Sequence, residues 1–255
     1  MAYTLTGARY VSFASGLTVG IFDPFILLSN QTLQVTLMMI GFFIIIADAP
    51  FIDSRTYYVL IRSGGSLWRH SMAGYIALQV LVYEGIILLG GMLPCIFRGN
   101  LAPVSDWGEA MQILLGAAPK IAWEQYDLPI LSSRILHGFS AVSAFGHSIL
   151  LNGAYLFLLG IVIFTGNLNT RLPVGNMAAV GIHLVGLLAI SDFVPLPQAS
   201  LICHGMMQCH IPGQGPLSLW VSYLLFGGLD VCVLLVLKKI SRHTDYNTAV
   251  SQKTW

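Results

Sequence analysis

The chain has 255 residues, of which only 9% are charged and 56% are hydrophobic, and its mean hydropathy is +0.76. A soluble domain carries roughly 25% charged residues, so this composition excludes a soluble globular protein and indicates an integral membrane protein. The formal net charge of +1 excludes a strongly basic nucleic-acid-binding protein.

Six apolar segments approach the roughly 20 residues that a helix needs to cross a bilayer. In chain order they are 10–29, 32–50, 74–96, 139–165, 176–196 and 216–237. We therefore predict an all-α polytopic membrane protein built as a six-helix transmembrane bundle. The first segment is the weakest because Asp23-Pro24 interrupts it, and the fourth is long enough to tilt or to break near Gly146.

The basic residues predict the orientation. With both termini in the cytoplasm, nine of the twelve Lys and Arg residues lie inside, and only Arg98, Lys120 and Arg134 lie outside. This bias follows the positive-inside rule, and the opposite orientation would invert it. We therefore predict an N-in, C-in protein with residues 53–73 in the cytoplasm and the loop 97–138 outside.

The loop 97–138 is the longest polar stretch of the chain. Between Asp106 and Ala118, apolar residues recur at a spacing typical of a short amphipathic helix: Trp107, Met111, Leu114 and Leu115. Such a helix at the membrane interface fits a cap over a translocation path and fits a simple connector equally well.

The loop after the second segment combines charge with helix signals. Asp53 is suited to cap a helix start, and residues from Arg55 to Arg62 can form two helical turns. Gly64-Gly65 then loosens the backbone, and Trp68 is typical of the membrane interface. A short helix that joins two spans can dock on a soluble motor protein, although an ordinary cytoplasmic loop fits the same residues.

The same loop resembles a known family. Asp48-Ala-Pro-Phe-Ile-Asp53, followed by Tyr58-Val-Leu-Ile-Arg62-Ser-Gly and by Trp68, is similar to the segment after the second span of bacterial ABC-2 type transporter permeases. Their length and six-span layout also match this chain. One difference is Gly65, where related sequences often carry a basic residue.

The resemblance implies that residues 1–255 form a single transmembrane permease domain of the bacterial cytoplasmic membrane. The loop 53–70 would then dock on a separate ABC ATPase subunit through Asp53, Arg55, Tyr58, Arg62, Trp68 and Arg69. The permease would pair with a second copy or with another permease, and it would export a peptide, a lipid-like or a drug-like molecule. The chain itself would need no cofactor, since ATP and Mg²⁺ would bind the partner subunit.

The sequence lacks an ATP-binding motif, which agrees with ATP binding on a separate subunit. The sequence contains no phosphate-binding loop of the form G-x-x-x-x-G-K-[ST], so we expect no ATPase site and no enzymatic activity on this chain. Acids in or near the apolar segments are candidates for an ion relay or for satisfied polar packing: Asp23, Asp48, Glu84, Asp192 and Asp230.

The histidines and cysteines support a second hypothesis, a membrane redox or metal-binding enzyme. His147 and His183 fall at different depths, which disfavours a shared haem. Cys203-His204 and Cys209-His210 supply possible metal ligands, but a disulfide between the two cysteines or free thiols would be simpler. A third hypothesis is a non-transporting immunity or scaffold protein with the same fold.

Overall fold

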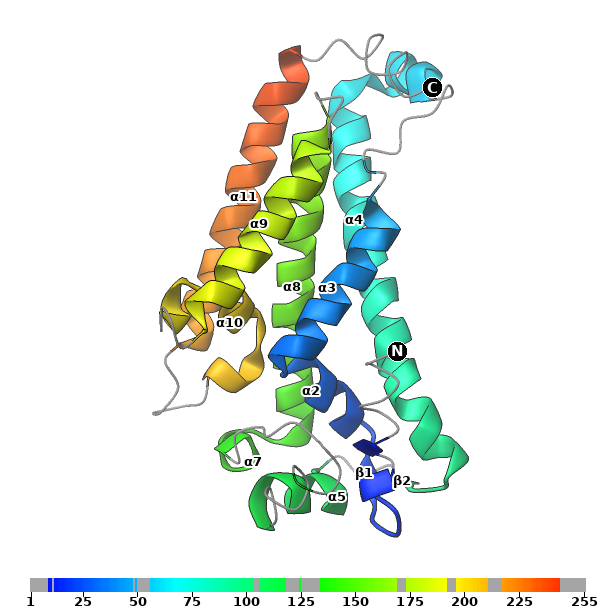
Figure 1. Cartoon of the computed structure of the whole chain (residues 1–255). Coiled ribbons are helices and arrows are strands. Elements are labelled where there is room, and N and C mark those ends of the chain that lie inside the picture. The colour runs from blue at the N-terminus through cyan, green and yellow to red at the C-terminus, as the bar shows by residue number, and fades with distance from the viewer. Residues whose placement is uncertain are drawn as a thin grey trace.

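The computed structural model describes residues 9–10, 12–47, 49, 56–102, 106–117, 124, 134–168, 173–191, 196–210 and 217–243. Most of these residues are helical (Figure 1). The elements in chain order are β1 (Val19–Gly20), α2 (Asp23–Ser29), α3 (Thr32–Ile46), α4 (Thr56–Phe97), β2 (Leu101–Ala102), α5 (Glu109–Gln112), the π-helical turn η1 (Ile113–Ala117), α7 (Arg134–Gly138), α8 (Ala141–Asn167), α9 (Val174–Ala189), the 3-10 turn η2 (Pro197–Ala199), α10 (Leu201–Gly205), the 3-10 turn η3 (Met207–His210) and α11 (Leu219–His243).

Three of the described helices are long and apolar enough to cross a membrane: the part of α4 from Gly64 to Phe97, α8, and α11 as far as Ile240. The helices α2 and α3 pass the same test only as a pair, and the chain bends by 87° between them. The helix α9 is apolar but has only 16 residues. The described residues therefore support a helical membrane protein with three spans, or four if the bent pair is one span, and they do not support six.

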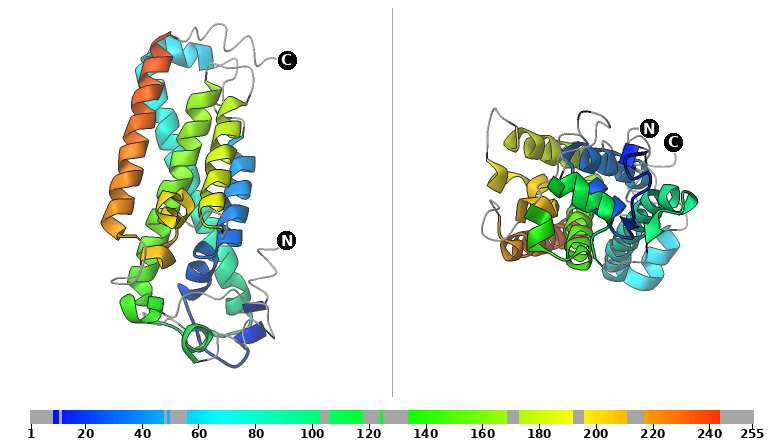
Figure 2. Two further views of the ribbon diagram at one scale, coloured as in Figure 1. Left: turned by 60° about the vertical axis from the view of Figure 1, so that its left-hand side comes forward. Right: turned by 90° about the horizontal axis from the view of Figure 1, so that it is seen from below.

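The long helices run side by side along the bundle, and α8 lies among them in contact with α3, α4, α9 and α11 (Figures 1 and 2). Two ends can be distinguished. We call the end that holds residues 56–70 of α4 and residues 238–243 of α11 the hinge end. The opposite end holds β1, β2, α5 and α7, and we call it the strand end.

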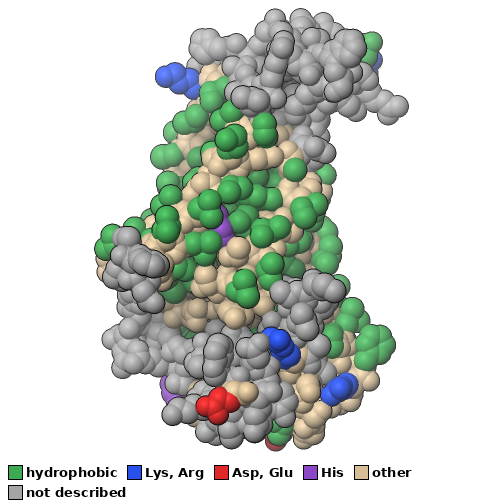
Figure 3. Space-filling model, in the orientation of Figure 1, with side chains coloured by type: hydrophobic (Ala, Val, Ile, Leu, Met, Phe, Trp, Pro, Cys, Tyr) green, Lys and Arg blue, Asp and Glu red, His purple; other side chains and the backbone are tan. Residues whose placement is uncertain are grey.

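Apolar side chains cover the middle of the bundle on the face shown in Figure 3, whereas charged side chains appear toward its two ends. Many of the large apolar residues on the long helices are exposed, among them Leu81, Ile86, Val185, Leu224 and Leu235. A continuous apolar surface of this kind would be costly in water and fits contact with lipid chains.

The prediction of one helix over 10–29 is wrong. Gly16 takes a φ of 83°, β1 pairs in parallel with β2, and a helix starts only at Asp23. Asn100 donates a hydrogen bond to the carbonyl oxygen of Ala14, so this segment lies at the strand end, beside the end of α4. The described residues therefore do not support a first span that starts in the cytoplasm.

The other predicted segments are helical with shifted boundaries. The third, predicted from residue 74, belongs to a helix that begins at Thr56 and passes through a kink at Gly64. The fourth continues through Gly146 without a break, and the second ends at Ile46 rather than at residue 50. The fifth and sixth correspond to α9 and α11, of which α9 is shorter than predicted.

Candidate functional site

A left-handed glycine divides α4 near its start. Gly64 has φ 75° and ψ 152°, a backbone conformation that is essentially restricted to glycine, and the residues on either side of it are helical. A Cβ atom added to Gly64 would meet no atom within 4 Å, so the glycine is required by the backbone and not by crowding. Residues 56–63 are therefore a short helical piece joined through one hinge residue to a long apolar span.

The predicted docking residues have different surroundings. Asp53 and Arg55 lie outside the described residues. The side chain of Tyr58 is 67% exposed, Arg62 is exposed and Arg69 is half-buried. These three side chains lie at the hinge end.

Trp68, another of the predicted docking residues, is buried in the bundle. Its side chain is only 4% exposed, and its ring centre lies 5.7 Å from that of Phe164 in α8. Trp68 therefore faces the inside of the bundle and not solvent. Its contact with Phe164 links the start of the α4 span to α8.

The predicted intramembrane acids also differ from one another. Asp48 and Asp192 lie outside the described residues, and Asp230 is partly buried. Glu84 is 1% exposed, and its carboxylate faces Gly153 of α8, where an added Cβ would come within 3.1 Å of Oε2. Within the described part of the chain, Oε1 of Glu84 has no hydrogen-bond partner. A glycine at position 153 therefore admits a carboxyl group between α4 and α8.

One carboxylate oxygen of Asp23 is bound by backbone groups, and the other, Oδ1, is buried with no hydrogen-bond partner among the described residues. Its Oδ2 atom accepts hydrogen bonds from the N–H groups of Gly20 (2.8 Å) and Gly108 (3.1 Å), and its side chain is fully buried. The carboxylate thus joins β1 and α2 to the segment before α5. The contacts of Oδ2 agree with satisfied polar packing, whereas the buried Oδ1 does not, so both interpretations of Asp23 stay open.

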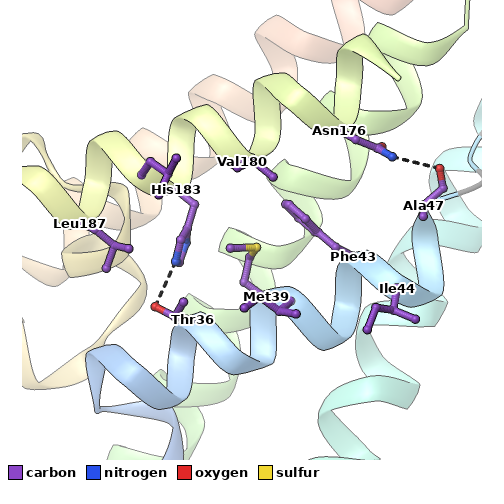
Figure 4. Close-up of a pocket in the computed structure, with 11 residues that line it drawn as sticks. Thr36, Met39, Phe43, Ile44, Ala47, Asn176, Val180, His183 and Leu187 are labelled. Carbon is purple, nitrogen blue, oxygen red and sulfur yellow. Dashed lines mark hydrogen bonds between the residues drawn. The ribbon is translucent and has the colours of Figure 1, made fainter. Parts of the chain in front are cut away.

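An apolar groove of about 490 Å³ lies between α3 and α9 (Figure 4). His183 points into it, with Nε2 3.1 Å from Thr36 Oγ1 and Nδ1 2.7 Å from Tyr155 Oη. The hydroxyl of Thr36 donates to the carbonyl oxygen of Thr32, so Nε2 of His183 must donate to Thr36 and Nδ1 must accept from Tyr155. Both ring nitrogens of His183 are therefore occupied by protein side chains.

A second polar cluster joins the connection between α9 and α11 to α11 itself. The hydroxyl oxygen of Ser222 lies 2.6 Å from Nδ1 of His204 and 2.6 Å from Nε2 of His210. The other nitrogen of each ring faces a backbone carbonyl, of Gln198 and Met206 respectively, and must donate to it. The single hydroxyl proton of Ser222 can therefore serve only one histidine at a time. Burial lowers the pKa of His210 to about 4 and so opposes a second proton.

The cysteines next to these histidines face each other. Cys203 Sγ and Cys209 Sγ lie 2.6 Å apart, and no disulfide bond joins them in this structure. Among the described residues, no group of three or more His, Cys, Asp and Glu side chains is arranged to hold a metal ion. The hydrogen bonds of His204 and His210 to Ser222 hold α10 and η3 against α11.

Thr36, Tyr155 and Ser222 complete the two histidine clusters and were not predicted from the sequence. The available signal was a polar residue inside an apolar helix, which must find a partner within the bundle. No protein-family model matches the chain, and neither a curated protein nor a solved structure matches it. Family membership therefore remains a prediction from the segment 48–68.

Proposed function

We propose that this chain is the permease subunit of an ABC-2 type transporter, driven by a separate ATPase that docks at the hinge end. The observation that supports this proposal is the short helical piece 56–63, which presents Tyr58 and Arg62 to solvent and joins a span through Gly64. The basic side chains of Arg62, Arg69 and Lys238 gather at the same end, which favours a cytoplasmic position.

The mechanism follows from how this piece is connected. A movement of residues 56–63 under the ATPase would reach the span through a single hinge residue, Gly64. Trp68 lies one helical turn further on and packs on Phe164, so the displacement would pass from α4 to α8. Two packed helices that shift together can alter a path through the bundle.

The proposed transporter contains two permease subunits and two ATPase subunits. The permease pairs with a second copy or with another permease in the bacterial cytoplasmic membrane. Two ATPase subunits bind ATP and Mg²⁺, and the substrate is a peptide, a lipid-like or a drug-like molecule that is exported. The redox alternative gains no support from His183, since both of its ring nitrogens already bind protein groups.

Charge reversal at the hinge end tests the proposal. Arg62→Glu places a carboxylate on an exposed position of the docking helix, and Lys239→Glu makes the same charge change on an exposed position of α11. Both variants should insert and fold normally, because exposed substitutions usually change the free energy of unfolding by no more than about 0.5 kcal/mol. At an interface, like charges can weaken docking by several kcal/mol.

The measurement is recovery of a candidate ATPase subunit from the same genome after co-expression, together with ATP hydrolysis by the purified complex. We expect loss of both for Arg62→Glu and retention for Lys239→Glu. Equal recovery with both variants would contradict docking at residues 56–63. Failure of every candidate ATPase to co-purify with the unmodified chain would favour the immunity or scaffold hypothesis.

A further inference from the structure

A second pocket lies at the hinge end, between the start of α4 and the end of α11. It encloses about 370 Å³, which is within the range of small-ligand sites. Its α4 side is formed by Ser66, Arg69 and Ala73, and its α11 side by Val231, Leu234 and Lys238. On each helix these residues are three, four or seven positions apart, so each set lies on one helical face.

The polarity of the pocket changes along the bundle. Residues 66 and 69 come before Ala73 in α4, and Lys238 comes after Val231 in α11, so both cations lie on the side toward the hinge end. The apolar residues lie on the side toward the middle of the bundle, where Val231 is 56% exposed and Leu235, which also lines the pocket, is 59% exposed. The pocket thus has a cationic mouth and an apolar wall that opens toward lipid.

The charges of the residues that line the pocket indicate which class of ligand it binds. Arg69 and Lys238 carry two positive charges, and none of the described residues that line the pocket carries a carboxylate. His70 also lines it, but its Nδ1 atom lies 2.7 Å from the carbonyl oxygen of Ser66, so its ring is held against its own helix. A guanidinium and an ammonium group facing one space suit a phosphate group, and basic pockets between transmembrane helices are known to bind anionic headgroups.

We propose that this pocket binds one anionic phospholipid, with the phosphate between Arg69 and Lys238 and an acyl chain along Val231, Leu234 and Leu235. A soluble anion would gain nothing from the apolar wall, and a neutral lipid would gain little from the two cations. This inference needs only that the helices lie in a membrane, and it does not rest on the transport proposal.

The test uses the full chain purified in a neutral detergent. Phosphatidylglycerol and phosphatidylcholine are titrated separately, and bound lipid is counted by native mass spectrometry. Arg69→Gln and Lys238→Gln should each weaken phosphatidylglycerol binding about fivefold, as expected for one basic residue near an anionic headgroup. Lys239→Gln is the matched control, because Lys239 is the next residue of α11 and does not line the pocket. It should weaken binding less than about twofold, since it lacks that contact.

Three results would overturn the proposal: equal binding of the two lipids, equal weakening by Lys238→Gln and Lys239→Gln, or displacement of phosphatidylglycerol by inorganic phosphate or glycerol 3-phosphate at matched concentration. The last result would identify a site for soluble anions. Size-exclusion chromatography reports folding of each variant. If Arg69→Gln is not monodisperse, the proposal is judged on the comparison of Lys238→Gln with Lys239→Gln. Both of these side chains are exposed, so neither substitution should disturb folding.

Discussion

At the strand end, buried hydrogen bonds join segments that are far apart in the sequence, whereas at the hinge end the side chains of Tyr58 and Arg62 face solvent. Asp23 binds the backbone of Gly108, and the indole of Trp107 donates to the carbonyl oxygen of Phe139 at 3.0 Å. Hydrogen bonds between distant segments therefore hold the strand end together, whereas side chains at the hinge end are exposed for contact with a partner. Substitutions at the two ends should therefore affect different properties.

The largest effect is expected at Asp23. Asp23→Ala leaves the buried N–H groups of Gly20 and Gly108 without an acceptor and should lower the free energy of unfolding by about 4 kcal/mol, since each unsatisfied buried group costs about 1–3 kcal/mol. Glu109→Ala removes an exposed carboxylate that accepts from Thr18 N–H and should cost less than about 0.5 kcal/mol. Chemical denaturation of the detergent-solubilised chain measures both. Similar losses for the two variants would show that the strand end is not locked by burial.

Acid should weaken the connection between α9 and α11. Burial, reinforced by His204, lowers the folded-state pKa of His210 to about 4, below its ordinary value of about 6.5. The unfolded chain then binds more protons, so the stability that His210 contributes is complete above pH 6.5 and is lost as the pH falls toward 4, by roughly 3 kcal/mol. His210→Gln should flatten this pH dependence, while His137→Gln, at an exposed position of α7, should leave it unchanged. Identical pH profiles for the two variants would argue against a buried neutral His210.

Ser222→Ala tests the same connection without changing charge. It removes the hydroxyl group between His204 and His210 and should cost about 2 kcal/mol, because a buried ring nitrogen loses its partner. Ser71 is exposed inside α4, and Ser71→Ala should change the free energy of unfolding by less than about 0.5 kcal/mol. Thermal unfolding at pH 7.5 compares the two. A neutral Ser222→Ala would mean that the histidines find other partners.

The smallest effect concerns the hinge. Gly64→Ala forces a side chain into a left-handed conformation and should destabilise the chain by about 1 kcal/mol. Gly74→Ala is the matched control, because Gly74 is helical and also has open space around its Cβ position. That change should stabilise the chain by about 0.5–1 kcal/mol, since alanine restricts the unfolded chain. Stabilisation by both would show that Gly64 is not held at positive φ.

The sequence predicted those features that depend on neighbouring residues. Long apolar runs located α8 and α11 to within a few residues at their starts, because burial or lipid contact of such runs requires a helix. The apolar spacing after Asp106 correctly indicated a helical segment, and its residues Met111 and Leu114 are buried. The Gly64-Gly65 pair correctly marked a backbone break in α4.

Features that depend on distant partners were not predictable in this way. The bend between α2 and α3 is held by Asn30, whose side chain donates to Ser148 Oγ and accepts from the N–H group of Gln208. Nothing near residue 30 reveals either partner. Burial of Trp68 likewise depends on Phe164, so the sequence could place Trp68 at the loop but not inside the bundle.

The bend at Asn30 also fixes an order of events during synthesis of the protein. The 15 residues of α3 span about 22 Å, which is less than the roughly 30 Å of a bilayer core, so α3 alone is a poor candidate for early insertion. The partners of Asn30 are translated 118 and 178 residues later. The hydrogen bonds that hold the bend can therefore be completed only after Gln208 has been synthesised, so α2 and α3 reach their final arrangement late.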